Sequence, residues 1–242
     1  MKKALILLIF FDACGQINST AQQLVDNSLA YYGGDHWDRA QLSFQFRNHR
    51  YGLQRDFGNF IYTRLALNDS LPYKDVLTSS GNFTRTLHGQ KIILSDSMAN
   101  VYTSSVNSVL YFVQLPYVLN DAAVVKERLP DCVIAGQNYF TLKITFAQEG
   151  GGEDFHDEFR YWMHQDTYAI DYMAYNYQTS GGGTRFRVAT AQKNIAGMIV
   201  QDYANYKADT QFPPLDSLPS YYQQGKLQKV STIVNTDWTL MD

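Results

Sequence analysis

The stretch from residue 155 to residue 188, FHDEFRYWMHQDTYAIDYMAYNYQTSGGGTRFRV, is the densest aromatic segment of the 242-residue chain. It predicts three consecutive strands, the first two joined by a short polar turn and the last two by a run of glycines. In the first strand Phe159, Tyr161 and Met163 share one face, and Trp162 belongs to the other. Aromatic residues at period-two spacing are typical of pleated, half-buried strands, so the segment indicates a large antiparallel sheet.

The same alternation recurs along most of the chain. It predicts further strands at residues 42–46, 57–67, 75–79, 82–87, 91–95, 139–147 and 195–207. The short connections between these runs indicate a meander. We therefore expect a mainly β (α+β) fold, a half-open and strongly curved antiparallel sheet of about ten or eleven strands wrapping two or three helices.

Two segments predict the helices. Thr20 and Gln23 have the spacing of a capping box at the start of a helix over residues 20–32. Residues 105–115 are apolar around most of a helical circumference, which predicts a buried helix that ends or kinks at Pro116. A second, shorter helical turn is expected at residues 122–128, and a weakly helical segment near residues 220–230.

The composition and the motifs argue against several classes of protein and function. With 45% hydrophobic residues, 18 Tyr and 14 Phe, the chain is too apolar to be disordered. A net charge of −3 without any Lys/Arg cluster argues against a nucleic-acid partner. No catalytic elbow of the Gly-x-Ser-x-Gly type occurs, and no cofactor is expected.

The N-terminus has the pattern of an export signal. Lys2 and Lys3 precede a short apolar run, and Cys14 then follows a small residue. This arrangement resembles the lipobox of bacterial lipoproteins, in which the cysteine carries the lipid anchor. It divides the chain into a signal peptide (residues 1–13), a tether (14–19) and a single domain (20–242). The alternatives are an ordinary signal peptide, or a disulfide between Cys14 and Cys132 that would exclude lipidation.

Several motifs together resemble an uncharacterised family of Bacteroidetes-type lipoproteins that is catalogued as a domain of unknown function. The resemblance covers residues 20–207. The motifs are YYGGDHW (31–37), LPYVLND (115–121), GGGEDFHDEFRYWMHQDTYAIDYMAYNY (150–177), GGGTRFRVA (181–189) and DYANYK (202–207). By fold, such proteins look like LolA and LolB, the periplasmic carriers and outer-membrane receptors of the lipoprotein-sorting pathway, in which a half-open barrel leaves an apolar cavity for acyl chains.

That resemblance implies a cavity for an apolar or acylated ligand. The inward-facing candidates to line it are Phe112, Leu115, Tyr117, Phe140, Leu142, Phe146 and Trp162. The same residues would also suit a filled core, because close packing is the default of protein interiors. Arg185 and Arg187 share a strand face and could meet an anionic head group, or pair with a sheet neighbour such as Asp171.

The acidic turn before the aromatic strand offers a different chemistry. Asp154, His156 and Glu158 share a strand face at a spacing that a divalent ion could use. A solvated turn that protects a sheet edge is the simpler interpretation, since no second His or Cys pair completes a ligand set.

These observations favour a lipid-anchored, non-catalytic binding protein for an apolar or acylated ligand. We expect it to be monomeric, to face the periplasm from the outer membrane and to contact that membrane through its anchor. An envelope lipoprotein that binds a protein or a glycan is the first alternative. A metal-dependent hydrolase using the cluster around His156 is the second.

Overall fold

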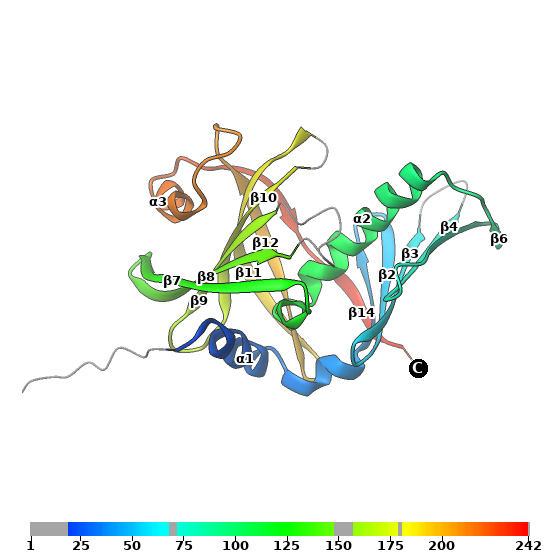
Figure 1. The fold of residues 1–242 in the computed structure, drawn as a ribbon, viewed down its shortest axis with the longest axis horizontal. Helices are drawn as coiled ribbons and strands as arrows, with labels where there is room; N and C mark the ends of the chain where they lie inside the picture. The colour runs from blue at the N-terminus through cyan, green and yellow to red at the C-terminus, as the bar shows by residue number, and fades with distance from the viewer. Residues whose placement is uncertain (1–18, 68–71, 148–156, 179–180, 242) are drawn as a thin grey trace, which may run out of the picture.

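The computed structural model describes residues 19–67, 72–147, 157–178 and 181–241 (Figure 1). The predictions for residues 1–13, for Cys14 and for Asp154 and His156 concern positions outside these ranges. Within the described chain, two seven-stranded sheets form the body of the protein, and every strand pair is antiparallel. The fold class that the sequence predicts, mainly β with a strongly curved antiparallel sheet and few helices, is confirmed.

The first sheet has the strand order β14-β1-β2-β3-β4-β5-β6. Its strands are β1 (Gln41–Phe46), β2 (His49–Asp56), β3 (Asn59–Ala66), β4 (Tyr73–Thr78), β5 (Phe83–Leu87), β6 (Gln90–Lys91) and β14 (Thr236–Leu240). The second sheet has the order β13-β12-β11-β10-β9-β8-β7. Its strands are β7 (Val124–Ile134), β8 (Gln137–Phe146), β9 (Glu158–His164), β10 (Ile170–Tyr177), β11 (Gly183–Ile195), β12 (Met198–Lys207) and β13 (Gln228–Ile233).

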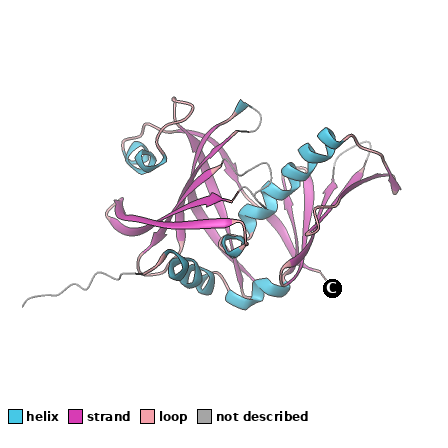
Figure 2. Ribbon diagram, viewed as in Figure 1, coloured by secondary structure: helices cyan, strands magenta, loops and turns pink. Residues whose placement is uncertain are grey.

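A two-residue joint at Val234 and Asn235 connects the two sheets. β13 and β14 are the edge strands that face each other across it, so the chain passes directly from one sheet to the other. Asn235 is buried there; its backbone N–H donates to Asp202, and its carbonyl accepts from Lys193 at 2.9 Å. The two sheets together have more strands than the ten or eleven expected. Figure 2 shows how these strands curve around the helices and form the wall of the protein.

Helices lie inside and at the rims of this wall. They are α1 (Ala21–Tyr31), α2 (Asp96–Val113), α3 (Leu218–Gln223) and the 3-10 turns η1 (Gly34–Arg39), η2 (Tyr117–Asn120) and η5 (Leu215–Ser217). The capping box of Thr20 and Gln23 is present at the start of α1. The helix α2 begins earlier than predicted, because the Ser95 hydroxyl caps it where a strand was expected.

The prediction of a helical turn at residues 122–128 is wrong. Most of that segment, from Val124 onward, belongs to β7, in which Val124 pairs with Phe146 of β8. Two successive β-branched residues, Val124 and Val125, suit a strand, and pairing along most of β8 outweighs the weak helical pattern.

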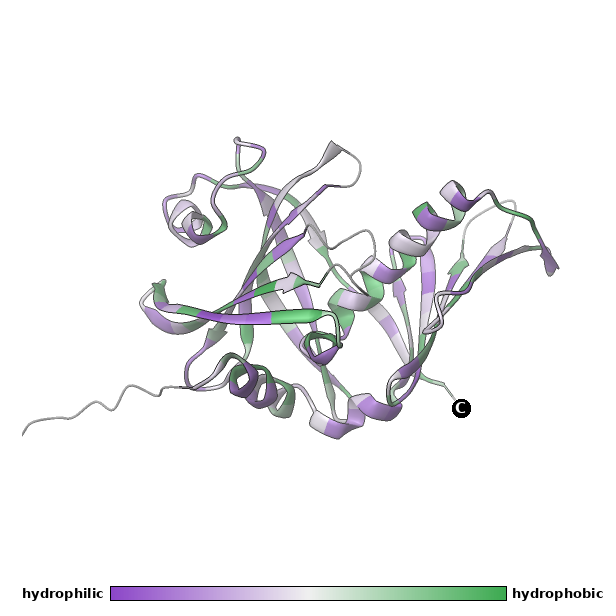
Figure 3. Ribbon diagram, in the orientation of Figure 1, coloured by the Kyte–Doolittle hydropathy of each residue, from purple (hydrophilic) through white to green (hydrophobic). Residues whose placement is uncertain are grey.

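Three apolar clusters hold the fold together. The first sheet packs its concave face on α2 through residues such as Phe44 and Leu110, and the second packs its concave face on α1 through residues such as Leu24 and Tyr161. On the convex face of the second sheet, Trp162 packs under the C-terminal segment that contains Leu215. The C-terminal half of α2 is the more apolar half (Figure 3). No helix in the described ranges is long and apolar enough to cross a membrane.

Candidate functional site

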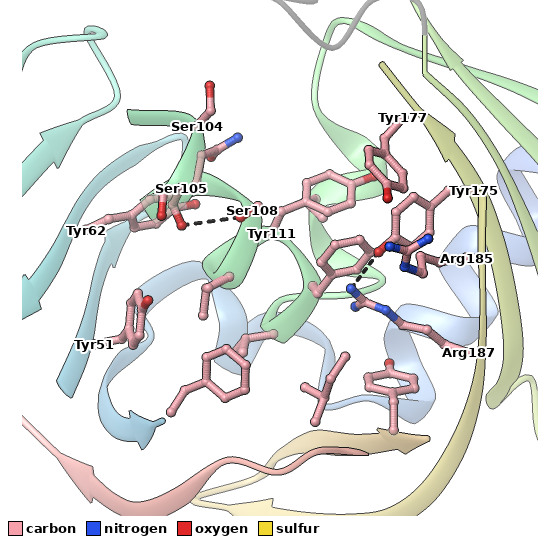
Figure 4. A pocket seen from close by; sticks show the side chains of 18 of the residues that line it. Tyr51, Tyr62, Ser104, Ser105, Ser108, Tyr111, Tyr175, Tyr177, Arg185 and Arg187 are labelled. Atoms are coloured by element: carbon pink, nitrogen blue, oxygen red, sulfur yellow. Dashed lines mark hydrogen bonds between the residues drawn. The ribbon is translucent and has the colours of Figure 1, made fainter. Parts of the chain in front are cut away.

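A cavity of about 1040 Å³ lies where α2 crosses the concave side of the wall. Both sheets and α2 contribute to its lining. In the close-up, Tyr51 and Tyr62 of the first sheet lie on one side of α2, and Tyr175 and Arg187 of the second sheet lie on the other (Figure 4). The interior is thus partly hollow rather than completely filled.

The helix α2 forms the middle wall of the cavity. Val106, Leu110 and Val113 recur at helical spacing and are buried against the first sheet. Ser105 and Ser108 lie on another face of the helix and line the cavity, so this wall presents small hydroxyls. Because the serine side chains are small, they leave cavity volume beside α2 that larger side chains would fill.

A row of charged residues attaches α2 to the first sheet. Asp75 of β4 lies directly between Arg64 of β3 and Arg85 of β5, and it is completely buried. The Arg64 side chain donates from Nε and Nη2 to Asp75 Oδ2 at 2.8 and 2.6 Å, and Nη1 reaches the Ser105 hydroxyl at 2.7 Å. Arg85 donates to both oxygens of the same carboxylate, at 2.6 and 2.9 Å. This row carries its own counterion and holds the helix in place.

The corresponding row of the second sheet is built around Arg187. Its register partners are Met173 on β10 and Asn205 on β12, and Asn205 pairs in turn with Ser231 on β13. The Arg187 guanidinium lies over the Phe112 ring at 3.7 Å and donates from Nη2 to the Tyr175 hydroxyl at 2.7 Å (Figure 4). It forms no ion pair with any described residue, although it is only 8% exposed.

Tyrosines near Arg187 do not supply a negative charge. Burial raises the pKa of Tyr161 well above its ordinary value and raises the pKa of Tyr203 to about 12. The positive charge of Arg187 lowers both values, but by less than burial raises them. Both hydroxyls therefore stay protonated at neutral pH.

Arg185 occupies a more exposed position on the same strand face. Its guanidinium lies 5.0 Å from the Tyr177 ring centroid, and Nη1 donates to the Thr184 carbonyl at 2.9 Å. Asp171, the partner that the sequence offered for these arginines, instead accepts a hydrogen bond from Tyr139 at 3.0 Å. The two arginines therefore share the cavity lining but differ in burial and partners.

The predicted lining residues divide into three groups. Phe112 and Phe146 line the cavity. Leu115, Phe140 and Leu142 belong to the packed core beneath it.

The remaining two predicted lining residues lie away from the hollow. Tyr117 packs at the edge of the other core, and its hydroxyl donates to Asp38 at 3.0 Å. The expectation that Trp162 faces the interior is wrong, because strand alternation turns it to the convex face, under the C-terminal segment.

Sequence reasoning missed the contribution of the first sheet to the cavity, above all Arg64 and Tyr51. One signal was available: Arg64 follows Phe60 and Tyr62 at period-two spacing, so it shares their face. A charged residue in phase with the inward aromatic residues of a strand indicates a polar feature inside.

The metal hypothesis gains no support from the described residues. Glu158 is engaged with Arg160 at 2.7 Å, and Arg160 also contacts Asp216 at the same distance. No group of three His, Cys, Asp or Glu residues within the described ranges could hold a metal ion. Cys132 has no disulfide partner among those residues, and burial raises the pKa of its thiol.

Comparisons with known proteins agree with the predicted fold. The sequence profile of a family described as a family of unknown function (DUF6503) matches residues 2–235. No curated protein matches the chain in sequence.

Two solved structures share the fold at low sequence identity. A LolA superfamily protein from Nitrosomonas europaea is similar with a TM-score of 0.50 and 12% identity, over 93% of this chain and 94% of that one. A DUF1329 family protein from Desulfovibrio piger has a TM-score of 0.50 and 10% identity, over 92% of both chains. The chain therefore has a LolA-like fold, as the sequence motifs suggested.

Proposed function

The chain belongs to the DUF6503 family, whose function is unknown, and we propose that it is a non-catalytic binding protein for an apolar or acylated ligand. The observation that carries this proposal is the cavity of about 1040 Å³ on the concave side of the sheet. Ligand sites in proteins are typically clefts of about 300–1,000 Å³, mostly apolar and with a few placed polar groups. Aromatic side chains such as Phe112 and Phe159 form part of the lining of this cavity. Its polar part includes four arginines (Arg47, Arg64, Arg185 and Arg187) and two aspartates (Asp121 and Asp157).

The location that we propose follows from the N-terminus. An acylated Cys14 would hold the domain at the outer membrane with its binding face in the periplasm, and residues 14–19 would act as the tether. We also propose that the protein is a monomer.

The proposal is tested by asking whether the purified chain contains an apolar ligand. We expect organic extraction followed by mass spectrometry to release a stoichiometric lipid from the wild-type protein. Ser108→Trp should reduce that occupancy strongly, because its indole enters the cavity from α2. Ser97→Trp is the matched control, since Ser97 is an exposed residue of the same helix outside the cavity.

The outcomes separate the candidate functions. Equal occupancy in the two tryptophan variants would place the lipid elsewhere and contradict the cavity as the binding site. A wild-type protein without any lipid, and with no affinity for added acyl chains, would favour the interaction lipoprotein that binds a protein or a glycan.

A further inference from the structure

Arg187 is the one buried arginine of the described chain that lines the cavity and forms no ion pair with a described residue. Five arginines are buried: Arg55, Arg64, Arg85, Arg160 and Arg187. Arg64, Arg85 and Arg160 form ion pairs, and Arg55 uses Nε, Nη1 and Nη2 in hydrogen bonds to an amide, a carbonyl and a hydroxyl. The buried Nε of Arg187 has no hydrogen-bond partner among the described residues.

A buried charge without an ion-pair partner lowers the stability of the folded protein, because it has lost its hydration. A guanidinium stays protonated at any physiological pH, so Arg187 cannot escape the cost by losing its proton. The Phe112 and Tyr175 rings, at 3.7 and 5.1 Å, stabilise the cation in part. They leave a net positive charge at the cavity wall, which an anionic ligand would neutralise.

A second polar group with an unused atom lies beside Arg187. Asn205 is its register partner on β12, so the two side chains point to the same face. The Asn205 Oδ1 atom is buried without a partner, while Nδ2 donates to the Ser231 hydroxyl at 3.2 Å. If the amide turns over, Oδ1 accepts from Ser231 and Nδ2 becomes a donor on the side where Oδ1 lay. Arg187 and Asn205 then offer donors to one anion.

Three phenylalanine rings form an apolar surface at this end of the cavity. The ring centroid of Phe159 lies 6.4 Å from that of Phe112 and 5.9 Å from that of Phe146, and all three rings line the cavity. The lining as a whole also contains the carboxylates of Asp121 and Asp157. We propose that Arg187 and Asn205 bind the carboxylate of a long-chain fatty acid whose alkyl chain lies against these rings. This inference rests on the proposed function and specifies its ligand class. One guanidinium balances the single charge of a carboxylate, and its fork matches the two oxygens.

The test measures the affinity for laurate and for dodecanol at pH 8 by equilibrium dialysis, with the full chain carrying Cys14→Ser so that no acyl group is attached covalently. We expect laurate to bind about 10- to 100-fold more tightly, as expected for hydrogen bonds to a charged group. Arg187→Met should remove this preference and leave the dodecanol affinity within about threefold. Arg185→Met is the matched control and should keep the preference.

Asn205→Asp gives the sharpest result. It places a permanent carboxylate beside Arg187, so it should abolish the preference for laurate while it raises the thermal midpoint of the unliganded protein. A merely structural Arg187 would leave the preference for laurate unchanged in both Asn205→Asp and Arg187→Met, and Arg187→Met would have a lowered thermal midpoint. That pattern would overturn the inference.

The remaining outcomes distinguish the inference from the proposed function. Equal binding of laurate and dodecanol by the wild-type chain would overturn the anion site and leave the apolar-ligand function standing. Binding of neither would overturn both. Lauroyl lysophosphatidylglycerol carries the same single charge on a phosphodiester, and tighter binding of this lipid than of laurate would overturn the assignment to a carboxylate.

Discussion

Asp75→Asn should destabilise the protein more than any other single loss of charge on the first sheet. Asp75 is completely buried and accepts four hydrogen bonds from Arg64 and Arg85. The amide keeps the shape of the carboxylate but leaves two guanidinium groups facing each other without a counterion. Removal of one partner of a buried ion pair costs about 3–5 kcal/mol. For a chain of this size, that corresponds to a thermal midpoint lower by about 6–20 °C.

Urea unfolding followed by far-UV circular dichroism measures this loss as a lower midpoint with an unchanged slope. Glu127→Gln is the control, because the Glu127–Lys143 pair is exposed and should contribute less than about 1 kcal/mol. The triple variant Arg64→Met/Asp75→Leu/Arg85→Met should be more stable than Asp75→Asn, since it removes the orphaned charges together. A loss below about 1 kcal/mol in Asp75→Asn would refute the reasoning, as would a triple variant that is no more stable.

Two further predictions concern pH and localisation. Burial raises the pKa of Asp171, so the folded state binds a proton more tightly than the unfolded state, and stability should fall as the pH rises from the ordinary aspartate value through the raised one. Asp171→Asn should therefore be more stable than wild type at pH 7 and lose that advantage near pH 3, whereas urea midpoints that differ equally at every pH would contradict this. Cys14→Ser should abolish incorporation of radiolabelled palmitate and release the protein from the membrane fraction, and an unlabelled wild-type protein would refute lipidation.

Much of the second sheet could be predicted from the sequence, because its strands are long and strongly patterned. In the aromatic strand β9, the alternation of Phe159, Tyr161 and Met163 with Trp162 predicted the two faces of the strand correctly. The pattern could not tell which face was the hollow one, since the C-terminal segment covers the convex face with apolar residues as well. Contacts between segments so distant in sequence leave no local signal.

The first sheet shows the opposite difficulty. On β3 the outward residues Ile61 and Leu65 are 42% and 39% exposed, whereas Tyr62 and Arg64 are buried. Hydrophobicity alone would therefore predict that Ile61 and Leu65 face the interior and that Arg64 faces the solvent. The ion pair of Arg64 with Asp75 of the neighbouring strand reverses that preference, and it depends on a register that the sequence does not reveal.

The two inward-facing polar rows, around Asp75 on the first sheet and around Arg187 on the second, have different roles. The first attaches the helix α2 to the wall, and the second leaves a positive charge at the cavity. On the first sheet, Arg64 and Arg85 share the carboxylate of Asp75, and Arg64 also donates to Ser105 of α2. On the second sheet, the position beside Arg187 is taken by Asn205, which has no charge to offer. Arg187 therefore lacks the carboxylate contact that stabilises the buried arginines of the first sheet, and a chain that retains such a cost at a cavity wall is expected to recover it on binding an anion. For this reason the stability of unliganded Arg187→Met, measured together with its preference for laurate, distinguishes a ligand site from a structural arginine more directly than a loss of binding alone.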